Sequence, residues 1–278
     1  MSRVGLLPAQ GGGSYSLVMR LFAGIGIVIA AAPVVIIFIM SFSASETSSF
    51  PPSEFSLRWY ESALKLFSSD QSSGVATALT SSLLVGLLVM VFSVSSCIPL
   101  AYALVRGQKR LRHSMELLFT LPLVFPLVML GIAFLLIAES LRWELGIWRL
   151  VIPHLALVMP FVLRNCLSAM QSISLETEEA AISLGASPLR AGLDIIVPLM
   201  KPGILAGLIF AFIISFNEFT ITFFMYTIDQ STLPIWMYSR TVSSLDPSTL
   251  ALSVFIILID LIMIIAIDKI IAGRASLF

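Results

Sequence analysis

Six long apolar segments limit what this chain can fold into. A helix that crosses the hydrocarbon core of a bilayer needs roughly 20 mostly apolar residues. Segments that meet or nearly meet this length cover residues 21–40, 76–105, 117–138, 150–170, 203–227 and 250–270. The sequence therefore predicts an all-α integral membrane protein with six transmembrane helices, joined in one domain over residues 21–273.

The composition agrees with a chain that is surrounded by membrane lipid. Hydrophobic residues make up 58% of the sequence, charged residues make up 12%, and the mean hydropathy is +1.01. Soluble domains carry about 25% charged residues. The 16 basic and 16 acidic residues cancel, so no net positive field favours a nucleic acid as a partner.

The distribution of Lys and Arg predicts the orientation, because these residues are retained on the cytoplasmic side during insertion. With six helices and an internal amino terminus, 11 of the 16 basic residues fall on the cytoplasmic side. We therefore expect residues 1–20 and 274–278 to be cytoplasmic tails. The first segment has 20 uncharged residues and exceeds the apolar core of about 7–15 residues in a signal peptide, so we expect it to be retained.

The most informative stretch, residues 171–202, lies between the fourth and fifth expected helices and is too polar to span a membrane. Ser174 is placed to cap a helix that Gly185 ends in a left-handed conformation. Ser187 and Pro188 restart the chain as a second short helix, which Pro198 is expected to stop. Small residues surround the bend and leucines flank it, a pattern typical of helix-in-groove docking to another protein.

The same stretch resembles the EAA signature of the permease subunits of type I ABC importers. The residues that carry the resemblance are Glu179, Ala180, Ala181, Gly185, Ile195 and Pro198. Val197 stands where the family has Leu, and the resemblance extends from about residue 76 to the carboxyl end. It implies that residues 171–202 form a cytoplasmic coupling helix seated on an ATP-binding subunit. The alternative is an amphipathic linker at the membrane interface.

The chain has no phosphate-binding loop of the form GxxxxGK[ST], so we expect it to be neither an ATPase nor the holder of a cofactor. By the resemblance, two separate cytoplasmic subunits bind and hydrolyse ATP. The resemblance also implies that a periplasmic or extracellular solute-binding protein delivers the solute. A second permease of similar fold, either identical or, as we expect, homologous but distinct, completes the pathway. The resemblance also implies a location in the inner membrane.

Ionisable residues inside the expected helices are candidates for the solute pathway, because burying them in hydrocarbon is costly. Glu218, with Asn217 beside it, is placed deep in the fifth helix, and Asp260 is placed near the middle of the sixth. Each of these acids either lines the pathway or bonds to a neighbouring helix, and the sequence leaves both open. His154 is expected to be a satisfied packing residue.

Residues 215–224 (SFNEFTITFF), followed by the LPIW run at 233–236, resemble the second permease of spermidine/putrescine importers. This implies a small amine or a polyamine-like solute, although related permeases carry aminophosphonates or ferric iron. An ion-driven secondary transporter would typically show paired repeats with broken helices, and none is expected here. An intramembrane metalloenzyme needs a motif such as HExxH, which two separated histidines, His113 and His154, cannot supply.

Overall fold

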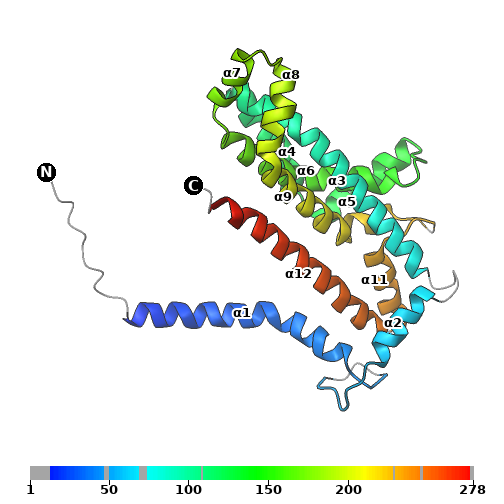
Figure 1. Ribbon diagram of the computed structural model, residues 1–278. Helices are drawn as coiled ribbons and strands as arrows, with labels where there is room; N and C mark the ends of the chain where they lie inside the picture. The colour runs from blue at the N-terminus through cyan, green and yellow to red at the C-terminus, as the bar shows by residue number, and fades with distance from the viewer. Residues whose placement is uncertain are drawn as a thin grey trace. The chain divides into compact units, whose positions relative to one another are not determined.

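A computed structural model describes residues 13–46, 50–68, 74–107, 109–227, 229–244 and 247–275, and these form helices with two isolated β-bridges (Figure 1). The helices are α1 (Gly13–Ser41), α2 (Arg58–Ser68), α3 (Val75–Arg106), α4 (Lys109–Val124), α5 (Leu127–Ser140), α6 (Trp148–Gln171), α7 (Leu175–Ser183), α8 (Pro188–Ala191), the π-helix η2 (Gly192–Ile196), α9 (Val197–Phe216), α10 (Thr220–Met225), α11 (Leu233–Ser244) and α12 (Ser248–Ala275). The all-α prediction is confirmed.

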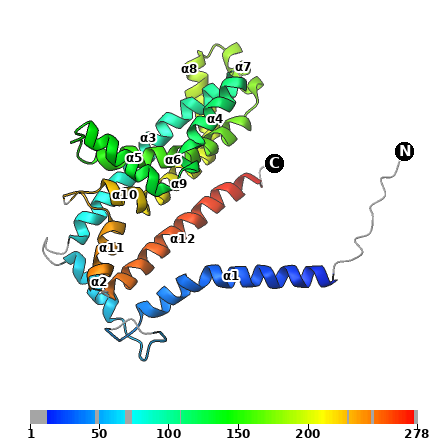
Figure 2. The same ribbon diagram turned by 180° about the vertical axis from the view of Figure 1, so that it is seen from behind.

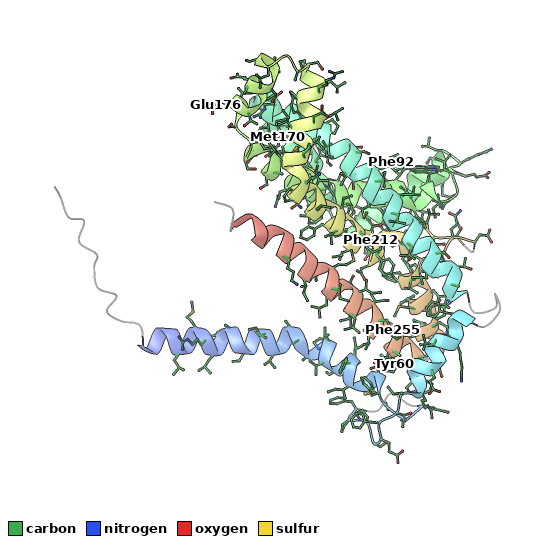
Figure 3. The ribbon with its side chains drawn as sticks, in the orientation of Figure 1. Tyr60, Phe92, Met170, Glu176, Phe212 and Phe255 are labelled. Carbon is green, nitrogen blue, oxygen red and sulfur yellow. The ribbon has the colours of Figure 1, made fainter. Side chains whose placement is uncertain are left out.

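The chain divides into two compact units, and the smaller one contains residues 1–64 and 246–255. Its longest element is α1, whose apolar stretch Leu17–Ser41 exposes most of its side chains, as expected of a helix that lies in lipid. At the end of α1, the Ser41 Oγ lies 2.7 Å from the Tyr60 hydroxyl of α2. The Tyr60 ring packs edge-on against Phe255 of α12, with centroids 5.7 Å apart (Figure 3).

The larger unit, residues 65–245 and 256–278, is built around α3, α6 and α9, which pack along one another (Figures 1 and 2). Two glycines one turn apart on α9 let it approach α6 closely. A Cβ added at Gly203 would lie 2.5 Å from the Ala169 Cβ, and one added at Gly207 would lie 3.3 Å from a Val162 methyl. Small residues spaced by four are a common solution for close helix packing in membranes, where packing rather than water drives association.

The expected third helix, residues 117–138, is broken in the structure. Residues His113–Val124 and Leu127–Ser140 are bent by 98° relative to each other. Pro126 explains the break, because proline has no N–H for the helix ladder and disfavours a helical conformation at the preceding residue. The described part of the chain thus has five helices that could each cross a membrane, and six if the bent pair is counted as one span.

The fifth helix in the structure also differs from the predicted range, residues 203–227, at both of its ends. It begins earlier, because Pro188–Phe216 is one continuous span and Pro198 does not stop it. The π-helix η2 just before Pro198 lets the helix continue past this proline. There the Val197 N–H donates to the Gly192 carbonyl, one residue farther back than in an α-helix. At the other end the helix stops at Phe216, and a separate short helix, α10, follows after Asn217, Glu218 and Phe219.

The short α10 packs against α5, which is the second half of the broken third segment. Gly131 of α5 makes the contact, since an added Cβ would lie 2.5 Å from the Phe224 ring and 3.3 Å from the Ile221 Cα. The expectation of unbroken spans was therefore wrong for two segments. Hydrophobicity did not reveal the first break because apolar residues flank Pro126 on both sides, whereas polar Asn217 and Glu218 stand at the second break.

Candidate functional site

Helices α7 and α8 meet in a tight bend at one end of the α3–α6–α9 bundle (Figures 1 and 2). Gly185 has φ +96°, and its N–H donates to the Ile182 carbonyl at 2.9 Å. The Ala186 N–H donates to the Ala181 carbonyl at 3.1 Å, which completes a Schellman cap. The predicted left-handed end of α7 is confirmed, and the reason for glycine there is the positive φ.

Serines precede both short helices, but only one of them caps its helix as predicted. The Ser187 Oγ accepts the Arg190 N–H at 3.3 Å, with Pro188 in the first turn. Ser174 stands at the cap position of α7, but its hydroxyl pairs with the Thr177 Oγ1 at 3.0 Å and not with a backbone N–H. That part of the prediction was wrong, because a neighbouring hydroxyl competes for the same side chain.

The bend presents apolar side chains that nothing in the described chain covers. Leu184 is 90% exposed, Leu189 is 72% exposed and Leu193 is 58% exposed. A Cβ added at Gly185 would meet no atom within 4 Å. Exposed leucines around an open, small-residue position are the features of an interaction surface.

The EAA-like residues are divided between this surface and the chain's interior. Glu179, Ala180, Gly185 and Pro198 are exposed, Ile195 is half-buried, and Ala181 is buried. Beside them an apolar groove of about 620 Å³ lies between α3 and the α8–α9 segment, and Leu189 and Leu193 line it together with Ile98, Pro99 and Tyr102 of α3. We take the exposed residues and the groove together as the candidate docking site.

A contact that sequence reasoning missed attaches α7 to α3. Glu178 is only 5% exposed, and its Oε2 accepts the Arg106 Nε at 3.0 Å, while its Oε1 accepts a hydrogen bond from the Tyr102 hydroxyl. An acidic residue in the first turn of a helix is expected to favour the helix amino terminus, and that rule alone does not point to a partner on α3. One signal was available: Tyr102 and Arg106 are four residues apart and so share one face of a helix.

A second polar cluster lies at the break between α9 and α10. The Glu218 carboxylate caps α10, with Oε1 accepting the Ile221 N–H at 2.7 Å and Oε2 accepting the Thr222 N–H at 2.8 Å. Oε2 also accepts the Thr222 hydroxyl at 2.7 Å. Glu218 is 6% exposed, so it lies inside the protein at a broken helix and not within a continuous one.

His154 of α6 joins both sides of this break, which makes it the satisfied buried residue that the sequence predicted. Its Nε2 lies 2.8 Å from the Thr222 Oγ1, and its Nδ1 lies 2.8 Å from the Ser215 Oγ. Because the single Thr222 hydroxyl proton goes to Glu218, the threonine oxygen accepts the His154 Nε2–H. In the neutral imidazole, Nδ1 then accepts the Ser215 hydroxyl. One neutral tautomer therefore satisfies the whole cluster.

Asn217 and Asp260 form a separate pair. The Asn217 Nδ2 donates to both Asp260 oxygens, at 3.1 and 2.9 Å, which joins the end of α9 to α12. Asn217 is exposed and Asp260 is half-buried. The structure thus brings two of the three predicted pathway residues together on an exposed face, and it turns the third, Glu218, toward the interior.

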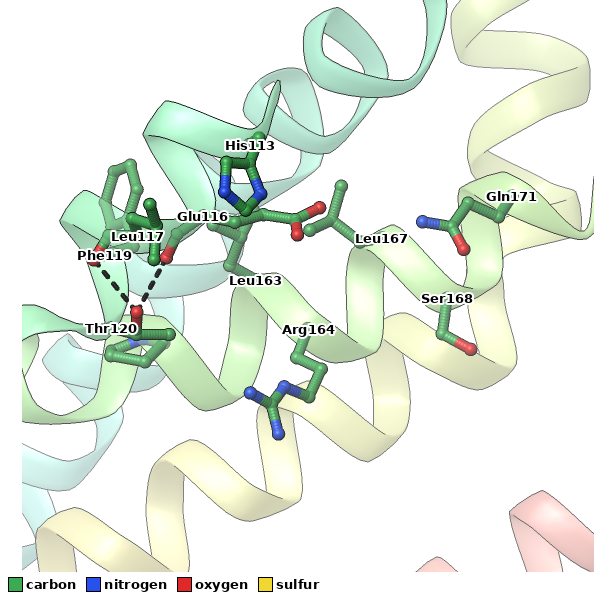
Figure 4. A pocket seen from close by; sticks show the side chains of 11 residues that line it. His113, Glu116, Leu117, Phe119, Thr120, Leu163, Arg164, Leu167, Ser168 and Gln171 are labelled. Carbon is green, nitrogen blue, oxygen red and sulfur yellow. Dashed lines mark hydrogen bonds between the residues drawn. The ribbon is translucent and has the colours of Figure 1, made fainter. Parts of the chain in front are cut away.

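A pocket of about 360 Å³ between α4 and α6, lined by both polar and apolar side chains, contains none of the predicted site residues (Figure 4). Arg164, Ser168 and Gln171 line it from α6, and His113, Glu116 and Thr120 line it from α4.

The phenylalanines of the fifth segment serve packing where contacts are described. Phe212, for example, lies 3.2 Å from a Cβ built on Gly86 of α3 (Figure 3).

Known proteins resemble this chain over most of its length. It is 25% identical over 235 residues to the spermidine/putrescine transport system permease protein PotC of Escherichia coli strain K12, covering 84% of this chain and 86% of PotC. It is 27% identical over 240 residues to the putrescine transport system permease protein PotI of the same strain, covering 84% and 83% of the two chains. It is 25% identical over 236 residues to the putative 2-aminoethylphosphonate transport system permease protein PhnV of Salmonella typhimurium strain LT2, covering 84% and 86%.

A solved structure and a family model agree with these relatives. A chain in the crystal structure of a bacterial ABC transporter involved in the import of the acidic polysaccharide alginate superposes with a TM-score of 0.64. The match covers 97% of this chain and 99% of that one at 20% identity, which shows a shared fold. The model of the binding-protein-dependent transport system inner membrane component matches residues 95–274. Because this match spans well over half of the chain, the protein belongs to that family of inner membrane transport components.

Proposed function

We propose that this chain forms half of the translocation pathway of an ATP-driven importer, and that the α7–α8 bend is seated on a separate ATP-binding subunit. The observation that carries the proposal is the uncovered bend itself, with Leu184 90% exposed beside a glycine above which space is open. An importer permease needs such a surface, because it does not hydrolyse ATP and must receive movement from its partner.

The proposal includes the orientation and the partners. Residues 171–202 form a cytoplasmic coupling loop within a permease domain over 21–273, and the tails 1–20 and 274–278 are also cytoplasmic. Two ATP-binding subunits hold all of the ATP, and this chain holds no cofactor. A homologous but distinct permease and a periplasmic solute-binding protein complete the complex. Co-purification tests this: an ATPase should copurify with the tagged chain, and its absence under mild detergent would contradict the proposal.

Sidedness gives a direct test of this orientation. In a variant whose native Cys97 and Cys166 are replaced by serine, a cysteine at Ser243 should react with an impermeant thiol reagent in intact spheroplasts. A cysteine at Ser187 should react only after the membrane is opened. Both positions are exposed, so burial does not explain a difference. Labelling at Ser187 in sealed cells would overturn both the orientation and the role of the bend.

The proposed solute is a small amine or polyamine. Two observations support it: the three relatives above are named for spermidine, putrescine and 2-aminoethylphosphonate, all of which contain amino groups, and the Asn217–Asp260 pair places a carboxylate on an exposed face. A carboxylate in a pathway lowers the barrier for a cation. In this proposal Asn217 and Asp260 line the route, and Glu218 holds the break beside them. An aminophosphonate or ferric iron is the alternative solute.

We expect Asp260→Asn to lower uptake of radiolabelled putrescine and spermidine by about tenfold, because it removes the charge but keeps an oxygen for the Asn217 amide. Glu61→Gln, at an exposed position on α2, is the matched control and should leave uptake unchanged. Uptake of labelled 2-aminoethylphosphonate and ferric iron, measured in parallel, discriminates the alternatives. Unchanged polyamine uptake in Asp260→Asn would remove this residue from the route.

A further inference from the structure

Helix α7 is attached to the rest of the protein through very few side chains. All of its residues are described, and only Glu178 and Ala181 are buried. Ala181 offers a single methyl group, so the Glu178 carboxylate makes the directional contact. Its partners, Tyr102 and Arg106, both belong to α3, the helix that packs along α6 and α9 in the core.

The Arg106 guanidinium also binds the loop that leads into α7. Its Nη2 lies 3.4 Å from the Ile173 carbonyl and 3.5 Å from the Ser174 carbonyl, in addition to the Nε contact with Glu178 at 3.0 Å. One side chain at the end of α3 therefore holds both the entry to α7 and its first turn. The ion pair is largely buried, with 16% of the Arg106 side chain and 7% of the Glu178 side chain exposed.

A buried ion pair costs desolvation free energy, because both charges leave water. Apolar side chains of similar size often hold two helices together equally well. What a charged pair adds is one defined geometry: a guanidinium and a carboxylate bond in few orientations. The two covalent connections of α7 do not lead into α3, so the ion pair supplies a direct link between these two helices. One is the short loop Ser172–Ile173–Ser174, and the other passes through the bend and α8 into the π-helix η2.

We propose that Tyr102, Arg106 and Glu178 form the joint that transmits movement of the α7–α8 bend to α3 and so to the core of the bundle. The proposal rests on the proposed coupling function of that bend. Glu178 is a positioning residue in this scheme: it contacts neither ATP nor solute, and it makes α7 and the end of α3 move as one body.

The first test compares neighbouring glutamates in the complete transporter in lipid nanodiscs. Glu178→Gln should lower the stimulation of ATP hydrolysis by the solute-binding protein about tenfold, while basal hydrolysis and the bound amount of ATPase persist. Tyr102→Phe keeps the ion pair and should lower stimulation less. Glu176→Gln, an exposed acid in the same turn of α7, is the control and should leave stimulation unchanged.

The second test measures the joint directly and does not depend on the solute. Spin labels on cysteines at Ser183 of α7 and Ser96 of α3, both exposed, report the distance between the helices after Cys97 and Cys166 are replaced by serine. We expect the same distance in the resting and vanadate-trapped states, and a distance that shifts or broadens in Glu178→Gln. A distance that changes between states with the ion pair intact would overturn the proposal.

Failure of this joint can be distinguished from failure of the proposed function by Gly185→Asp in the same assays. If Gly185→Asp uncouples transport but Glu178→Gln retains full stimulation, the bend couples and the joint proposal is wrong. If neither variant changes stimulation while the ATPase stays bound, the coupling role of the bend is itself wrong. Loss of the ATPase from Glu178→Gln alone would assign this residue to docking and would also contradict the joint.

Discussion

Gly185→Asp should strongly lower solute uptake while the chain still inserts in the membrane. Gly185 has φ +96°, where a residue with a side chain is strained by roughly 1–2 kcal/mol. The larger effect comes from position: the space above Gly185 is open in this chain, and a carboxylate placed there would occupy the volume that a docked partner needs. We expect uptake to fall by about tenfold or more, since in the proposed function this bend carries the coupling contact.

The control for this prediction is Gly146→Asp, in the connection between α5 and α6. Gly146 also has a positive φ, +54°, and is exposed, so the variant carries the same new charge and a similar backbone strain. It should retain uptake, because Gly146 does not belong to the bend. Membrane abundance and ATPase co-purification are measured for both variants. Wild-type uptake in Gly185→Asp with the ATPase bound would exclude the bend from the mechanism.

Glu218→Gln is the second change with a large expected effect. Both carboxylate oxygens accept backbone N–H groups of α10, and glutamine offers an NH₂ in place of one of them. An NH₂ cannot accept, so a buried N–H at Ile221 or Thr222 is left unsatisfied, at a cost of about 1–3 kcal/mol. We expect a lower melting temperature of the purified complex together with a loss of uptake, because the break between α9 and α10 loses its cap.

Thr222→Val decides whether Glu218 acts through structure or through its charge. This variant keeps the carboxylate but removes the hydroxyl that joins Glu218 to His154. The Thr222 Oγ1 lies 2.7 Å from the Glu218 Oε2 and 2.8 Å from the His154 Nε2. If Glu218 holds the break, Thr222→Val lowers stability and uptake in the same way as Glu218→Gln. Reduced or altered solute selectivity in Glu218→Gln, with normal stability and a silent Thr222→Val, would instead place the Glu218 charge in the solute route.

Local chemistry explains why the α7–α8 bend could be predicted from sequence. A glycine at a left-handed position, a serine before a proline and a run of small residues act within one or two turns of helix. The Schellman cap at Gly185 and the Ser187 cap follow from these residues alone. The expectation that Ser174 caps α7 was wrong, because the nearby Thr177 offers the Ser174 hydroxyl a different partner.

The breaks in the third and fifth segments show where sequence reasoning stops. A proline in the sequence does not by itself predict a break. Pro126 separates α4 from α5, whereas Pro198 follows a π-helix without ending the span and Pro33 lies inside α1. The break after Phe216 has no proline at all. It is held by Glu218, Thr222 and His154, and the last of these comes from another helix. Only packing between helices decides such cases.

By itself the sequence determined the features that depend on composition and on interactions between residues close in the chain. These are the helices in a membrane, the family, and the local shape of the bend. Hydrophobic length selects spanning helices because every backbone group must be bonded within lipid. The tertiary structure alone decided which polar groups meet. It joined Glu178 to Arg106, 72 residues apart, turned Glu218 inward and paired Asn217 with Asp260, 43 residues apart. The orientation of a helix about its own axis sets these pairs, and neighbouring helices fix that orientation.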